Sequence, residues 1–150
     1  MQTKLTPAFL QAPQGREADK ILRSCVHCGF CTATCPTYQL LGDELDGPRG
    51  RIYLMKQLLE GQEVTAKTQG HLDRCLTCRS CETTCPSGVS YGRLIDIGRE
   101  LVEERVQRPA LVRLKRTLLR RVLPFPTRFS ALLGLGRAVR PLLPKPLAKK

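Results

Sequence analysis

Apolar residues recur every three or four positions along most of the chain, which is the spacing of amphipathic helices. No segment shows the strict alternation of a half-buried strand. The clearest helix is predicted between Asp46, which with Gly47-Pro48 forms a cap and first turn, and a stop at Gly61. Four apolar residues share one face of this helix: Ile52, Met55, Leu58 and Leu59. The pattern predicts an all-α fold.

Three further helices are predicted around two cysteine-rich segments. Residues 14–24 and residues 65–74 each lead into one of these segments. After the second segment, Ser90 can cap a helix that ends before Pro109. One face of that helix carries Tyr91, Leu94, Ile95, Leu101 and Val102. We expect this helix to pack across both cysteine-rich segments.

The two cysteine-rich segments are copies of one motif. A shift of fifty positions aligns Cys25–Pro36 with Cys75–Pro86, and each copy reads Cys-x2-Cys-x2-Cys-x3-Cys-Pro. This is the run of bacterial 4Fe–4S sites, in which the fourth Cys binds the other cluster when two are present. The predicted ligands of one cluster are therefore Cys25, Cys28, Cys31 and Cys85. Those of the other are Cys75, Cys78, Cys81 and Cys35.

Other uses of the cysteines fit less well. A zinc site commonly has two Cys-x2-Cys pairs 15 to 20 residues apart, whereas each run here contains a further cysteine. A zinc module that binds nucleic acid through the basic tail is the alternative of another class. A disulfide framework or a catalytic thiol would not produce two such runs. The chain contains no flavin, nicotinamide or phosphate-loop fingerprint, so we predict an electron carrier without catalytic residues of its own.

Composition and charge indicate the cellular compartment of the protein and a boundary between two domains. Only 5% of the residues are aromatic and Trp is absent, so the core is modest and bound metal would supplement it. No stretch resembles a secretory signal or a membrane span, which favours the reducing cytoplasm. Residues 1–100 contain 12 Lys/Arg and 11 Asp/Glu, whereas residues 101–150 contain 13 and 2. We predict a cluster domain at 1–108 and a basic tail at 109–150.

The basic tail begins with a predicted amphipathic helix from Leu111. Its apolar face could pack on another subunit, which is favoured, or rest with its arginines on the anionic inner face of the membrane. Contact with nucleic acid is disfavoured, because the tail has no interleaved aromatic residues or binding motif. The prolines beyond Val122 predict that the last 25 residues form a linker.

Four other residues leave alternatives open. His27, inside the first cysteine run, either faces solvent or turns toward the cluster to tune it. His71 is predicted on the surface of a helix. Arg49 and Arg51 either dock a partner or pair with the neighbouring acidic residues Asp43, Glu44 and Asp46.

Most of residues 1–110 resemble one known family. The two cysteine runs, together with the segment Gly42-Asp-Glu-Leu-Asp-Gly-Pro-Arg-Gly-Arg51, are similar to the iron-sulfur subunit of glycolate oxidase. The resemblance implies an α-helical ferredoxin-type domain cross-linked by two 4Fe–4S clusters. It also implies flavin-containing partner subunits that oxidise glycolate, and electron delivery to a membrane acceptor such as quinone.

Two points qualify this resemblance. Related two-cluster subunits serve lactate or glycerol-3-phosphate dehydrogenase complexes, and only the Gly42–Arg51 segment favours glycolate. Members of the family continue into a region with Cys-Cys-Gly motifs, which this sequence lacks. We therefore expect the chain to correspond to an N-terminal portion of such a subunit.

Overall fold

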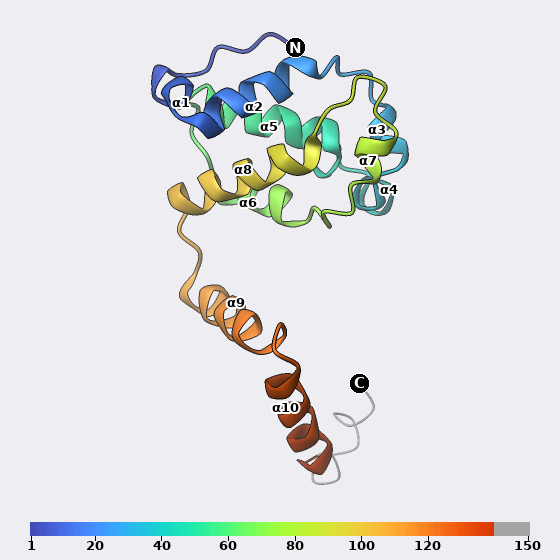
Figure 1. The fold of residues 1–150 in the computed structure, drawn as a ribbon, viewed down its shortest axis with the longest axis vertical. Coiled ribbons are helices and arrows are strands. Elements are labelled where there is room, and N and C mark those ends of the chain that lie inside the picture. Colours follow the sequence, from blue (N-terminus) through green and yellow to red (C-terminus); the bar gives the residue numbers. More distant parts are fainter. Residues whose placement is uncertain (140–150) are drawn as a thin grey trace. The chain divides into compact units, whose positions relative to one another are not determined.

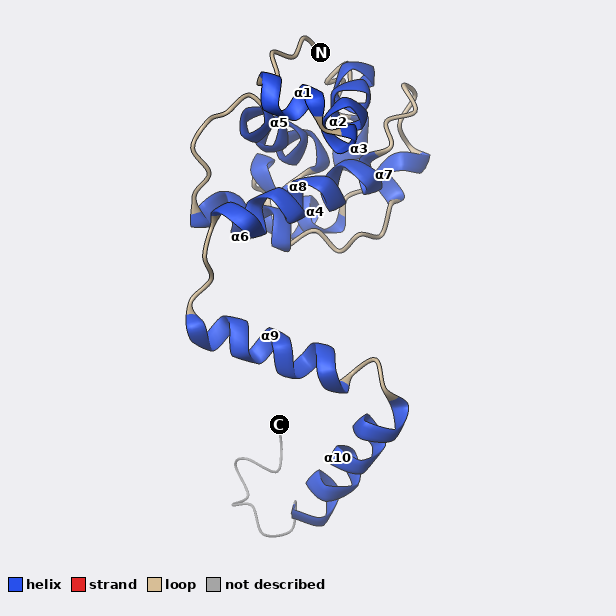
Figure 2. Ribbon diagram, turned by 60° about the vertical axis from the view of Figure 1, so that its left-hand side comes forward, coloured by secondary structure: helices blue, strands red, loops and turns tan. Residues whose placement is uncertain are grey.

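The computed structural model describes residues 1–139, and these contain helices and loops but no strand (Figures 1 and 2). The all-α prediction is thus confirmed over the described range. The chain divides into two compact units, the first from Met1 to Gln107 and the second from Arg108 onward. The elements are α1 (Pro7–Gln11), α2 (Pro13–Ser24), α3 (Phe30–Ala33), α4 (Pro36–Leu41), the 3-10 helix η1 (Glu44–Asp46), α5 (Pro48–Leu59), α6 (Ala66–Asp73), α7 (Ser80–Thr83), α8 (Tyr91–Arg105), α9 (Ala110–Val122) and α10 (Pro126–Val139).

Proline marks the start of many of these helices. It occupies the first turn of α1, α2, α4 and α5, where its missing N–H costs no hydrogen bond. The four helices predicted from periodicity are α2, α5, α6 and α8. Thr65 caps α6 through its side chain, but Ser90 makes no such bond at α8. Asp46 does not cap α5 either: Gly47 takes that position, because the Asp46 carboxylate is engaged in a buried ion pair.

The core of the first unit lies between α8 and the helices α2, α5 and α6 (Figure 1). Gly98 lets α8 approach α5 closely, since a Cβ there would overlap the Met55 side chain. The fully or nearly fully buried apolar residues are Ala18, Leu22, Met55, Leu58, Leu59, Leu72, Leu94, Ile95, Ile97 and Val102. Predicted core residues from the faces of α5 and α8 are thus buried, and Leu101 packs at their margin.

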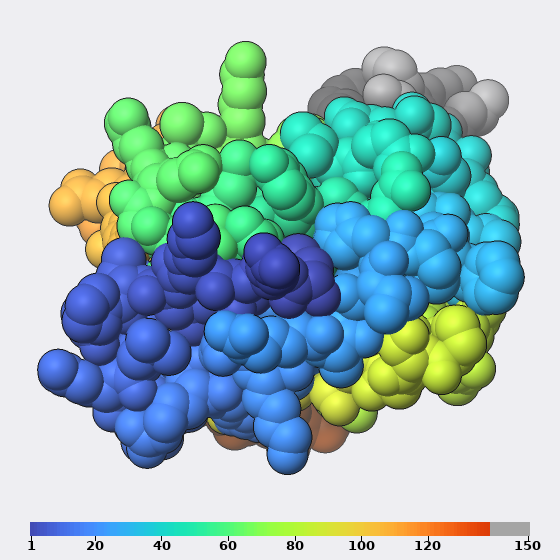
Figure 3. Space-filling model, turned by 90° about the horizontal axis from the view of Figure 1, so that it is seen from above, coloured from blue at the N-terminus to red at the C-terminus, as the bar shows by residue number. Residues whose placement is uncertain are grey.

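The two cysteine runs meet at one end of this unit. The short helices α3 and α7 lie side by side there in both ribbon views (Figures 1 and 2). Thr34 donates a hydrogen bond to the carbonyl oxygen of Ser80, 3.3 Å away, and its repeat equivalent Thr84 donates to Thr34. In Figure 3 the yellow-green segment around the second run contacts the blue segment around the first. Residues fifty positions apart therefore form one joint.

The second unit contains the predicted amphipathic helix as α9. Its apolar residues include the exposed Leu111, Leu114 and Leu118. The prediction of a linker over the last 25 residues is wrong for residues 126–139, which form α10. The reason is that Pro126 lies at the first helical position and no proline follows until Pro141. Pro141, Pro144 and Pro146 lie outside the described residues. Over residues 1–139, no helix is both long enough and apolar enough to cross a bilayer.

We expect Gly50→Ala to destabilise the protein by about 1–3 kcal/mol, because a Cβ at this position would clash with the Glu44 carbonyl oxygen of η1. Gly70→Ala is the matched control. It lies inside α6 with no atom near the added carbon, so it should stabilise the helix by about 0.5–1 kcal/mol. Urea unfolding of both iron-loaded variants under argon measures the difference. Equal midpoints would contradict close packing of η1 on α5.

Candidate metal centres

Both cysteine runs adopt the same unusual backbone. Positive φ angles occur at His27 (57°) and Gly29 (87°) in the first run, and at the equivalent Thr77 (53°) and Arg79 (59°) in the second. Side-chain-bearing residues rarely take this conformation unless the surrounding structure requires it, and such strain concentrates at functional sites. Each run therefore forms the same tight loop, which turns its first three cysteines to one side.

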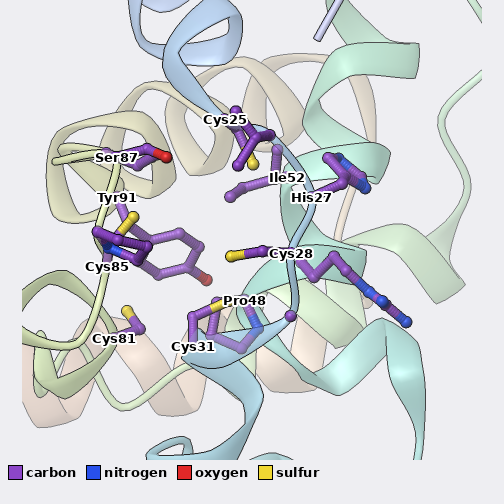
Figure 4. Close-up of a pocket in the computed structure, with 15 residues that line it drawn as sticks. Cys25, His27, Cys28, Cys31, Pro48, Ile52, Cys81, Cys85, Ser87 and Tyr91 are labelled. Atoms are coloured by element: carbon purple, nitrogen blue, oxygen red, sulfur yellow. The ribbon is translucent and has the colours of Figure 1, made fainter.

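The first pocket is the space lined by Cys25, Cys28, Cys31, Cys85 and Cys81. Figure 4 shows these five sulfurs arranged around a common space into which the Tyr91 ring extends. Three of the cysteines come from the first run and two from the second. Cys25 is buried and Cys28 is exposed, so the pocket reaches from the core to the surface.

The second pocket is lined by Cys75, Cys78, Cys81 and Cys35. Here three cysteines come from the second run and one from the first. Cys81, Tyr91 and Pro48 line both pockets, so the two sites are adjacent and share a wall. The structure thus brings the four predicted ligands of each cluster to the same pocket.

Burial and the neighbouring sulfurs raise the pKa of two of these thiols, Cys31 and Cys81. Burial raises the pKa of Cys81 to about 12, with further contributions from the neighbouring Cys31, Cys75 and Cys35 sulfurs. Burial and the neighbouring Cys25 thiol likewise raise the pKa of Cys31. Closely spaced sulfurs of this kind become thiolates when a metal cation compensates their charge. The donor set therefore suits a metal with soft sulfur ligands.

Comparison with known proteins identifies the type of metal group. Residues 21–89, which include all eight cysteines, match the family described as 4Fe-4S dicluster domain. Residues 21–89 therefore form an iron-sulfur domain of this kind. The thiol-lined pockets of the dicluster domain fit such a group, because sulfur is the ligand that iron-sulfur clusters take from proteins.

Three curated relatives are similar to the chain over segments of different length. The glycolate oxidase iron-sulfur subunit of Escherichia coli (strain K12) is 65% identical over 150 residues, which is 100% of this chain and 37% of the relative. The probable glycolate oxidase iron-sulfur subunit of Bacillus subtilis (strain 168) is 45% identical over 85 residues, 55% of this chain and 19% of the relative. The succinate dehydrogenase iron-sulfur subunit of Paracoccus denitrificans is 27% identical over 92 residues, 57% of this chain and 36% of the relative. The resemblance inferred from the sequence is confirmed, and the chain spans about a third of the length of the Escherichia coli relative.

A buried ion pair supports the wall of the dicluster domain beside Cys35. Arg51 is 1% exposed, and its guanidinium lies 3.4 Å from the Asp46 carboxylate, which is itself 2% exposed. His71 and Arg74 also contact this carboxylate, at 3.0 and 2.8 Å. Burial alone would raise the pKa of Asp46, but hydrogen bonds from His71 and Arg74 hold it below its ordinary value.

The contacts around Asp46 and Glu44 decide between the alternatives left open for Arg51 and Arg49. Arg51 pairs with an acidic residue and is too deeply buried to dock a partner, whereas Arg49 pairs with Glu44 at the surface, 2.8 Å away. The prediction that His71 is a surface residue is wrong. Its side chain is only 13% exposed, because it closes over Asp46.

The His27 side chain is neither fully exposed to solvent nor directed at the cysteine sulfurs. Its ring is half-buried and turns away from the sulfurs in Figure 4, and its Nε2 atom is buried without a hydrogen-bond partner. Burial, followed by the nearby charge of Arg49, lowers the pKa of His27. His27 is one of the residues that line the first pocket, and its lowered pKa favours the uncharged ring there.

Sequence reasoning missed three hydroxyl groups that contact cysteine sulfurs. Thr37 Oγ1 lies 3.2 Å from Cys35 Sγ, while Ser80 Oγ and Tyr91 Oη donate to Cys78 Sγ and Cys75 Sγ, each across 3.6 Å. Hydrogen bonds from the Ser80 backbone and hydroxyl lower the pKa of Cys78. The position of Ser80, two residues after Cys78, could have indicated this contact from the sequence. Tyr91 was predicted only as a core residue.

We expect Asp46→Asn to destabilise the dicluster domain by about 3–5 kcal/mol, because it leaves the Arg51 guanidinium buried without a full counter-charge. Glu44→Gln is the matched control, since it breaks the exposed Arg49 pair of the same segment and should change stability little. Urea unfolding of the iron-loaded proteins compares the two. Similar losses in both variants would contradict the importance of burial.

Proposed function

We propose that this chain is the iron-sulfur electron-transfer part of a complex that oxidises glycolate to glyoxylate. The observation that carries the proposal is the composition of the two pockets: each brings together the first three cysteines of one run and the fourth cysteine of the other, with Cys81 lining the first pocket as well. This is the arrangement expected of two cross-ligated 4Fe–4S clusters. When bound, such clusters supply one-electron redox chemistry at positions close to each other.

The proposed ligands follow from this arrangement. Cys25, Cys28, Cys31 and Cys85 would hold one cluster at the first pocket. Cys75, Cys78, Cys81 and Cys35 would hold the other at the second pocket. The protein residues supply the sulfur ligands, orient them through the two strained loops, and exclude water from Cys25, Cys35 and Cys81, which are buried. Cys28 and Cys78, which are exposed, would lie where electrons enter or leave.

The substrate and partners follow from the relatives. Because the Escherichia coli and Bacillus subtilis proteins carry the name of glycolate oxidase, we assign glycolate to the complex rather than lactate or glycerol 3-phosphate. The substrate-oxidising site would belong to flavin-containing partner subunits. The chain would take electrons from the flavin and pass them toward a membrane acceptor such as quinone.

The proposal also covers location. We place the complex in the cytoplasm, at the inner face of the cytoplasmic membrane. The amphipathic α9 supports this, because its basic and apolar faces suit either a partner subunit or an anionic lipid surface.

The ligand assignment predicts that mutation of the last cysteine in one run alters the cluster held mainly by the other run. The protein purified without oxygen should contain about eight iron and eight sulfide ions. Cys35→Ser should alter the EPR signal of the cluster held mainly by the second run, and Cys85→Ser that of the cluster held by the first. The matched pair differs only in which run loses its last cysteine. Stoichiometric zinc, or an effect confined to each variant's own run, would contradict the assignment.

The carrier role predicts that the isolated chain does not oxidise glycolate, D-lactate or glycerol 3-phosphate. Affinity purification from its native cells should recover a flavoprotein that oxidises glycolate and reduces the clusters of this chain. Absorbance near 400 nm after substrate addition measures the reduction. A partner active only on D-lactate or glycerol 3-phosphate would overturn the glycolate assignment, and turnover by the chain alone would overturn the carrier role.

A further inference from the structure

The two pockets differ in the hydrogen bonds that reach their sulfurs. Among residues 1–139, all three side-chain hydroxyl contacts to a cysteine sulfur fall on the second pocket: Thr37 with Cys35, Ser80 with Cys78 and Tyr91 with Cys75. None falls on Cys25, Cys28, Cys31 or Cys85. The internal repeat makes this asymmetry informative, because each position in one run has an equivalent in the other.

Comparison of equivalent positions shows the origin of the difference. Ser80 corresponds to Phe30 in the first run, which has no hydroxyl to donate. Thr37 corresponds to Ser87, which has a hydroxyl and lines the first pocket but makes no contact with a sulfur. Tyr91 lines both pockets, yet its hydroxyl donates to Cys75 of the second.

Arg51 fixes the orientation of Thr37. Its Nη1 donates to Thr37 Oγ1 across 3.2 Å, which occupies a lone pair of the hydroxyl and leaves its single proton for another acceptor. The Asp46 carbonyl oxygen, 2.9 Å away, and Cys35 Sγ compete for that proton. A metal-bound thiolate carries negative charge, so it is favoured over a neutral carbonyl.

Other features that influence the reduction potential of a cluster are nearly the same at the two pockets. Each has one exposed cysteine, Cys28 in the first and Cys78 in the second. Each also has one arginine in its outer wall, Arg49 and Arg79 respectively. Arg51, which lines only the second pocket, is buried, but the Asp46 carboxylate 3.4 Å away offsets its charge. Arg51 therefore acts mainly by orienting the Thr37 hydroxyl.

Hydrogen bonds to the sulfurs and nearby positive charge both favour the reduced form of an iron-sulfur cluster, because reduction adds negative charge. We propose that Thr37, Ser80, Tyr91 and Arg51 give the cluster at the second pocket the higher reduction potential of the two. The first electron added to the chain then resides at the second pocket. These are positioning residues, since they act through the ligating sulfurs.

The inference rests on the proposed occupancy of both pockets, and the test separates the two. Iron and sulfide content with EPR of the reduced wild-type chain establishes the clusters, and Cys35→Ser and Cys85→Ser assign each signal. EPR at low temperature is then recorded while dithionite lowers the solution potential stepwise. Absence of two cluster signals would refute both the proposed function and the inference.

With both clusters present, Thr37→Val should lower the potential of the second-pocket cluster alone. We expect the ratio of second-pocket to first-pocket reduction to fall about tenfold, which is about 59 mV for one electron. Tyr91→Phe and Ser80→Ala should shift it in the same direction, and Thr37→Ser should restore the wild-type value. Removal of Arg51 is avoided as a test because it would disrupt the buried pair with Asp46.

Ser87→Ala is the matched control, because it removes the repeat-equivalent hydroxyl and should leave both potentials unchanged. Equal shifts of both clusters in the Thr37→Val protein would indicate a general structural effect and overturn the proposal. Unchanged potentials in all three hydroxyl variants, or a higher potential at the first pocket in the wild type, would also overturn it.

Discussion

The convergence of eight cysteine sulfurs on two adjacent pockets is the constraint on which this structure depends. Burial and the neighbouring sulfurs raise the pKa of Cys81, and a metal cation allows such a thiol to act as a thiolate. The rest of the first unit serves this convergence. The helices α2 and α6 lead into the two cysteine runs, and α8 packs against both helices. Contacts between Thr34, Ser80 and Thr84 join the runs directly.

A small apolar core is compatible with this design. The buried residues of α2, α5, α6 and α8 form a single cluster that includes Cys25 and Cys81. Two of the proposed ligands are therefore part of the core. Ligand bonds between distant segments would restrict the unfolded chain in the same way as cross-links, so metal binding and folding are coupled. This explains how a chain with 5% aromatic residues can hold its cysteines in strained loops.

The network around Asp46 breaks the symmetry of the internal repeat. The two runs share their spacing and their backbone conformations, but only the second pocket has a buried arginine and three hydroxyl contacts. A duplicated motif supplies two similar electron sites, and two sites of equal potential would give an electron no preferred position. The segment between the runs, from Asp46 to Arg51, is thus more than a connection, since it supplies the buried ion pair beside the second pocket and the guanidinium that orients Thr37.

Local patterns in the sequence predicted the longer helices of the first unit and the candidate metal ligands. Proline stands at the start of α1, α2, α4, α5 and α10, and the repeated cysteine spacing indicated both the cofactor and which cysteines belong together. Only the tertiary structure decided the surroundings of those ligands. Thr37 and Ser87 are equivalent in the repeat, yet only Thr37 contacts a sulfur, and Arg51 orients it by donating to its hydroxyl. Likewise, the His71 side chain is largely buried because it faces a carboxylate 25 residues away. Such contacts depend on how η1, α5 and α6 pack, which no local spacing of residues encodes.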